Sequence, residues 1–255
     1  MANQGEIADD VADAVHRLFA DAIEPSIECR PDASKVFRPS NEFRSAHCYT
    51  EAVDTVLRSY EPSLRLLHFR WACRLETGHS SGAGHGASEW QLARGEQPSL
   101  GIGGWKGLCR AFGLIHADLT ERDVALAFAM SRMRVIDEQS DRGRAALEGL
   151  TFEDFLEALC RLATQKALPT DRELHAAGAV SAGEHLWHMR TEKPDEFDHF
   201  VESRARPWGS EPPQSVARCV AHLCSLLVVT CQLNEGDGIQ LSESQVDAFI
   251  FMQNT

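Results

Sequence analysis

The stretch Leu150-Thr151-Phe152-Glu153-Asp154-Phe155-Leu156-Glu157-Ala158-Leu159 decides the fold that this sequence predicts. Thr151 is followed three residues later by Asp154, and an apolar stripe at helical spacing comes next, which is the pattern of a helix start. The acid would lie at the positive end of the helix dipole. The same pattern, Leu-Thr-x-x-Asp and then an apolar residue, occurs at 119–124, with a looser echo at 100–105. Repeated helix starts predict a repeated helix–loop–helix plan.

Helical periodicity extends over most of the chain, and no segment alternates convincingly as a strand would. We therefore expect an all-α fold with at most short bridging strands. A helix is expected to begin near Tyr49, to be interrupted at Pro62, and to be followed there by a second helix, because proline suits a first turn. Further helices are expected at 1–22, 103–114, 120–133, 152–163, 171–177, 195–206, 214–233 and 242–251.

The order of these elements suggests three parts. Residues 1–48 form an N-terminal helix and an irregular, proline-containing connector. Residues 49–168 hold the two helical hairpins, with a long glycine-rich loop at 77–99. Residues 169–255 form a C-terminal helical extension.

Charge and cysteine usage exclude several classes of protein. The formal net charge is −13, which argues against binding to duplex nucleic acid or to an anionic membrane surface, and fits basic protein partners better. The longest apolar run, Leu223–Val229, is too short to span a membrane. Eight cysteines are spread over the whole chain without a CxxC pair, which is typical of reduced thiols and a cytoplasmic location.

The middle of the chain, about 56–115 and 119–165, resembles a pair of EF-hand units. The stretch 150–159 is similar to the end of an EF-hand loop with its exiting helix. The resemblance implies that Leu100 and Leu150, at loop position 8, join the two hands through a short two-stranded bridge. It extends to degenerate EF-hand modules of large protist and flagellar proteins. That likeness implies a docking role and a cytoskeletal or axonemal location, in a cilium or flagellum.

The loops do not carry the ligands that calcium needs. A working loop supplies oxygen from positions 1, 3, 5, 7, 9 and 12, with glycine at position 6. With Leu150 at position 8, Asp154 is at position 12, but positions 1, 3 and 5 hold glycine, alanine and leucine. With Leu100 at position 8, position 12 is Gly104. We therefore expect a degenerate, non-calcium-binding pair without a cofactor.

A calcium-responsive regulator remains an alternative, with its site in the loop 134–149 or in 234–243. The second loop meets part of the ligand pattern, although a glycine-rich turn between helices explains it better. The weak candidate ligands for calcium are Asp137, Asp141, Asp154, Asn234, Asp237 and Glu243.

The preferred function is a non-enzymatic interaction or scaffold protein whose opened helix pair accepts an amphipathic helix of a protein partner. The residues expected to line that groove are Trp105, Phe112, Phe128, Met130 and Met133. An enzyme with a dispersed site, built on a cysteine or on His185 and His188, is a further alternative. No catalytic residue is assigned, and the histidines of the loop 79–86 are interpreted as loop polarity.

Overall fold

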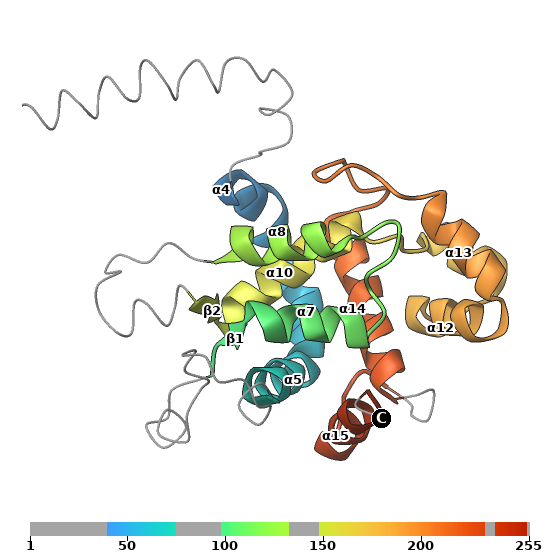
Figure 1. The fold of residues 1–255 in the computed structure, drawn as a ribbon. Coiled ribbons are helices and arrows are strands. Elements are labelled where there is room, and N and C mark those ends of the chain that lie inside the picture. Colours follow the sequence, from blue (N-terminus) through green and yellow to red (C-terminus); the bar gives the residue numbers. More distant parts are fainter. Residues whose placement is uncertain (1–39, 75–97, 133–147, 233–237, 254–255) are drawn as a thin grey trace, which may run out of the picture. The chain divides into compact units, whose positions relative to one another are not determined.

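The computed structural model describes residues 40–74, 98–132, 148–232 and 238–253 (Figure 1). Of these residues 71% are helical and 2% are in strands, so the expected all-α class is confirmed. They belong to one compact unit, Ser40–Thr255. The expected helix 1–22 and most of the loop 77–99 lie outside the described residues. No described helix combines the length and the apolarity that crossing a membrane would need.

The first hairpin consists of α5 (Glu51–Arg74), β1 (Leu100–Gly101) and α7 (Ile102–Ala111). The expected break at Pro62 is wrong, since α5 continues through it. An internal proline costs roughly 3 kcal/mol of helix stability. Here burial of the apolar face that follows it offsets this cost, because Leu64, Leu67 and Trp71 are almost wholly inaccessible to solvent.

The second hairpin consists of α8 (Glu121–Ser131), β2 (Gly149–Leu150) and α10 (Phe152–Gln165). Both predicted helix starts are present as capping boxes, in which the Thr120 and Thr151 hydroxyls accept from the backbone three residues later. In each box the carboxylate of the acid accepts the threonine N–H in return. These reciprocal bonds fix where each helix begins.

The described residues just before the first hairpin, 40–48, are also helical. We expected an irregular connector up to residue 48, but α4 (Ser40–Phe43) and a π-helical turn, η2 (Arg44–Cys48), occupy its end. Arg44 holds this segment in place, because its guanidinium donates to the Glu157 carboxylate (2.6 Å) and to the carbonyls of Met130, Ser131 and Arg132. The last three contacts satisfy carbonyls at the end of α8.

Among the described residues after the hairpins there are five helices: α11 (Asp171–Ala177), α12 (Ala182–Glu192), α13 (Pro194–Glu202), α14 (Val216–Gln232) and α15 (Glu243–Met252). The expected helices match four of them within a few residues, whereas α12 was not among them. The helix α14 packs against α5, α10 and α12. The C-terminal helices are therefore built into the same core as the hairpins.

Candidate functional site: the paired hairpins and the helix between them

The two hairpins meet at a two-stranded antiparallel bridge. Leu100 pairs with Leu150, and Gly101 pairs with Gly149. Both leucine side chains are fully buried. Gly149 allows the backbones to approach, because a Cβ atom there would lie 2.0 Å from Ser99 Oγ. The predicted pairing of Leu100 with Leu150 is therefore confirmed.

A buried histidine strengthens this bridge. His68 of α5 lies with Nε2 3.0 Å from the Leu150 carbonyl oxygen, which accepts from the neutral Nε2–H tautomer. Its ring centroid lies 5.8 Å from that of Phe152 and 5.3 Å from that of Phe155. Burial lowers the pKa of His68 below its usual 6.5. The entering helix of the first hairpin is thus joined to the strand of the second through an uncharged side chain.

The acid at position 12 of the second loop serves as a helix cap. Asp154 accepts the Thr151 N–H at 3.2 Å, and its own N–H donates to the Thr151 hydroxyl, also at 3.2 Å. Its side chain is 2% exposed. The other weak candidates in this loop, Asp137 and Asp141, lie outside the described residues.

The third candidate loop is described only in part. Asn234 and Asp237 lie outside the described residues, whereas Glu243 forms an ion pair with Arg70 of α5 (2.5 Å). Within the described ranges, no group of three or more histidine, cysteine or acidic side chains is placed to hold a metal ion.

Three of the five side chains predicted to line a partner groove lie in the core of the described unit. Trp105 and Phe112 are fully buried, and Phe128 is 5% exposed. The Trp105 indole N–H donates to the Val124 carbonyl at 2.9 Å, which ties α7 to α8. Met130 is half-buried, and Met133 lies outside the described residues. In this arrangement the buried aromatic residues do not face an open groove.

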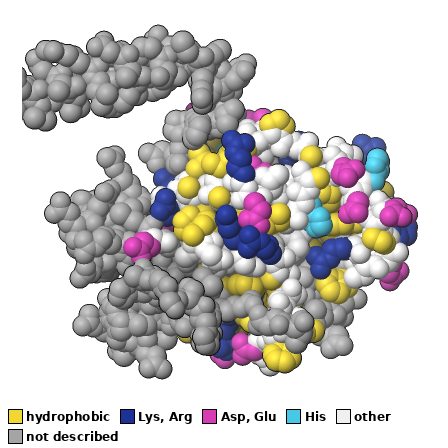
Figure 2. Space-filling model, viewed as in Figure 1, with side chains coloured by type: hydrophobic (Ala, Val, Ile, Leu, Met, Phe, Trp, Pro, Cys, Tyr) yellow, Lys and Arg dark blue, Asp and Glu magenta, His cyan; other side chains and the backbone are white. Residues whose placement is uncertain are grey.

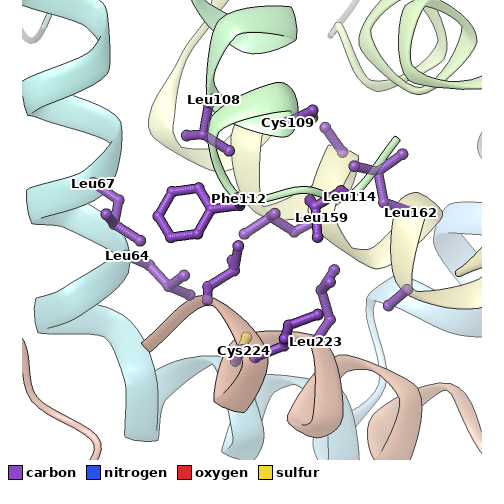
Figure 3. Close-up of a cluster of buried hydrophobic side chains, with 14 of the residues drawn as sticks. Leu64, Leu67, Leu108, Cys109, Phe112, Leu114, Leu159, Leu162, Leu223 and Cys224 are labelled. Carbon is purple, nitrogen blue, oxygen red and sulfur yellow. The ribbon is translucent and has the colours of Figure 1, made fainter. Parts of the chain in front are cut away.

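The chain's own C-terminal helices cover those side chains. Leu223 and Cys224 of α14 lie in the same buried cluster as Phe112 and Leu159 of the hairpins (Figure 3). From α15, the ring of Phe249 stacks on Phe112 with a centroid distance of 4.6 Å. The chain's own helices α14 and α15 therefore occupy the space where we expected the helix of a partner protein.

A buried ion pair locks the connection between the hairpins. Lys166, just after α10, donates to Asp118 Oδ1 (3.0 Å) and to the Leu114 carbonyl (3.0 Å), and the Ala167 N–H donates to Asp118 Oδ2 (2.6 Å). The two charged side chains are at most 2% exposed. Single lysines and acids in a sequence carry no signal of such pairing, so this contact was not foreseen.

A second buried cluster of charges, also not foreseen, fixes α10 to η2. Glu157 accepts from Arg161 within α10 (2.6 and 2.9 Å) and from Arg44 of η2 (2.6 Å). The side chains of Glu157 and Arg161 are at most 4% exposed. The Glu-x-x-x-Arg spacing is visible in the sequence and indicates a helical pair, but not its burial.

The three cysteines of α14 do not have the environment of nucleophiles. Burial raises the pKa of Cys219 to about 11, and the pKa values of Cys224 and Cys231 to about 12. A thiol reacts as the thiolate, so these groups are unreactive near neutral pH. His222 lies between Cys219 and Cys224 in the sequence, but its Nε2 atom is 3.1 Å from the Asp171 carboxylate and is not paired with either of these thiols in the described contacts.

His185 and His188 lie together on the outer side of α12, as their spacing predicted. They line a surface cleft with Glu184 and Glu192, and His188 Nδ1 lies 3.2 Å from Glu192 Oε1. The pKa of His185 is lowered by burial. The histidines of the loop 79–86 lie outside the described residues.

The arrangement as a whole is two helical hairpins that are joined at Leu100 and Leu150 and that pack against α14. Comparison with known proteins gave no match: no family model, no curated protein and no solved structure is significantly similar to this chain.

Proposed function

We propose that this chain is a non-enzymatic protein-interaction or scaffold module, built on an EF-hand-like pair of hairpins that works without calcium. The order helix–strand–helix, repeated twice and joined at loop position 8, supports the EF-hand-like part of the proposal. The observation that carries it is the antiparallel pairing of Leu100 with Leu150. The EF-hand resemblance predicts this pairing, although the two residues are 50 positions apart in the sequence.

The roles of the turn residues support the proposed independence from calcium. Asp154, which would be the bidentate ligand of the second hand, is used as a helix cap, and position 12 of the first hand is Gly104. The loop positions that would complete each cage hold no carboxylate at positions 1, 3 and 5. Calcium therefore has little to bind, and the hairpins are held by apolar packing and buried ion pairs instead.

The occupied groove changes how such a module would recognise a partner. A calcium sensor exposes an apolar groove when it opens. Here α14 is buried on nearly every face, so it is part of the core, and displacing it would expose the core to water. We infer that a partner protein binds the outer surface of the closed unit, and that a cytoskeletal or axonemal location belongs to the same proposal.

Affinity capture with the 255-residue chain tests this function. Tagged protein is incubated with cell extract either in 1 mM calcium or in chelator, and the captured proteins are quantified by mass spectrometry. This calcium concentration is roughly one thousand times the dissociation constant of a typical calcium sensor. The proposal predicts a partner that is retained equally in both and that binds again when both proteins are purified. Capture that requires calcium would support the calcium-responsive alternative and contradict this proposal.

A further inference from the structure

A cleft of about 410 Å³ lies on the outer side of α12, beside the turn that joins α11 to α12. It is separate from the buried hairpin core. The side chains that give it chemical character are Val180, Glu184, His185, Trp187, His188 and Glu192. In Figure 2, acidic and histidine side chains, with lysine or arginine side chains among them, are visible on the side of the molecule where Figure 1 draws α12 and α13.

The cleft is held on a rigid support. Gly183 packs directly onto α14, because a Cβ atom there would lie 2.4 Å from the Ser225 carbonyl oxygen, and the Gly183 N–H donates to Ser225 Oγ at 3.1 Å. The Ser181 hydroxyl caps α12, and Gly178 ends α11 in the left-handed conformation. These contacts hold the backbone of the turn and of α12 in place beneath the lining residues.

The charged residues that line the cleft are acidic. Glu184 makes no side-chain ion pair with any described residue, and Glu192 forms an ion pair with His188 (3.2 Å) when that histidine is protonated. The described lining contains no lysine or arginine. Burial is the main cause of the lowered pKa of His185, so that imidazole is neutral near pH 7. The complement of this lining is a cation.

The lining also offers apolar contact. Val180 is 90% exposed, although valine is ordinarily covered, and it stands at the tip of the turn. The Trp187 indole lies between this cleft and a small inner cavity, where the guanidinium of Arg190 is 5.6 Å from its ring centroid. An aromatic face and an exposed valine suit the methylene stem of a long basic side chain.

We propose that this cleft is the docking site for a lysine or arginine side chain of a partner protein, with Glu184 receiving the charge and Val180 and Trp187 contacting the stem, while Glu192 adds a second negative charge further along the cleft. The proposal rests on the interaction function proposed above and names the partner's chemistry. A net charge of −13 acts in the same direction, because it attracts basic partners from a distance.

A defined peptide tests the site directly. The full-length, ¹⁵N-labelled protein is titrated with a 12-residue peptide of alternating lysine and leucine, and with the same peptide carrying glutamate in place of lysine. The lysine peptide is expected to shift the amide signals of 177–192, and the glutamate peptide is expected to shift none. Signals that move elsewhere, or that move equally with both peptides, would overturn the proposal.

Charge-neutral variants sharpen the test. Glu184→Gln and Glu192→Gln should each weaken binding of the lysine peptide by about two- to fivefold, the range of exposed ion pairs, and the double variant by about tenfold. Glu202→Gln on α13 removes the same charge outside the cleft and should change affinity less than about twofold. Equal losses in all three single variants would mean non-specific attraction and contradict the assignment.

The outcome separates this inference from the proposed function. A purified partner that still binds the double variant with unchanged affinity would overturn the cleft while the interaction function stands. Absence of any partner in the capture experiment would count against the function, whereas the peptide titration reports on the cleft alone.

Discussion

Shortening Leu223 to alanine should lower the stability of the whole unit and not only of its C-terminal part. Leu223 lies on α14, its side chain is 1% exposed, and it belongs to the cluster shared with both hairpins. Leu→Ala removes three carbon groups, worth about 0.8 kcal/mol each on burial, or roughly 2.4 kcal/mol. The cavity left behind adds to this, so we expect a loss of about 3–4 kcal/mol.

Urea unfolding followed by far-UV circular dichroism and by tryptophan fluorescence measures this loss. The buried Trp105 lies in the hairpins and makes fluorescence sensitive to their unfolding. Both signals should shift together to lower urea with an unchanged slope, because the described helices share one core. A loss of about 3 kcal/mol is a large fraction of the roughly 5–15 kcal/mol that a domain has.

Val229→Ala is the matched control on the same helix. Val229 is only half-buried, so its truncation should cost less than about 1 kcal/mol. If Leu223→Ala shifted only a small, separate transition and left the fluorescence midpoint unchanged, α14 would be an appendage. The reasoning that places it inside the hairpins would then be refuted.

Three further changes test other parts of the account. Asp154→Ala should lower the free energy of unfolding by about 1 kcal/mol or somewhat more, because it removes the acid of a helix cap. Asp123→Ala removes the equivalent but more exposed acid at the start of α8 and should lower it by no more than that. Urea unfolding midpoints measure both losses, and an unchanged midpoint for Asp154→Ala would contradict the capping role. Since the folded-state pKa of His68 lies below 6.5, the unfolded chain binds more protons under that pH, so stability is full above pH 6.5 and falls as the pH decreases below it. His68→Gln should reduce this slope in thermal unfolding between pH 7 and 5, and an identical slope would exclude His68 as a source. Asp118→Ala should cost about 3–5 kcal/mol because it leaves the Lys166 ammonium buried without a partner, whereas adding Lys166→Met should recover part of the loss; additive losses in urea unfolding would argue against the pair.

The sequence predicted the features that short local patterns encode. The Thr-x-x-Asp starts at 120 and 151 appear as capping boxes, because the bonds that define them lie within four residues. The pairing of Leu100 with Leu150 was also predictable, since the EF-hand resemblance assigns the same loop position to both residues.

The sequence could not show how distant helices dock. The prediction at Pro62 failed because burial of the face that follows outweighs the local cost of a proline. The apolarity of 216–232 on nearly all sides did indicate a buried helix, and this was the available signal that α14 fills the hairpin core. The partner that covers a given apolar face is set by packing over long sequence distances, so the occupied groove became visible only in three dimensions.

A double-mutant cycle between Leu100 and Leu150 tests the central claim most directly. Each leucine is changed to alanine alone and both together, and urea unfolding gives the four free energies. The account predicts a coupling of about 0.5–3 kcal/mol, because the two fully buried side chains come from directly paired positions of β1 and β2. Losses that add within about 0.3 kcal/mol would mean that the two hairpins do not meet at these residues.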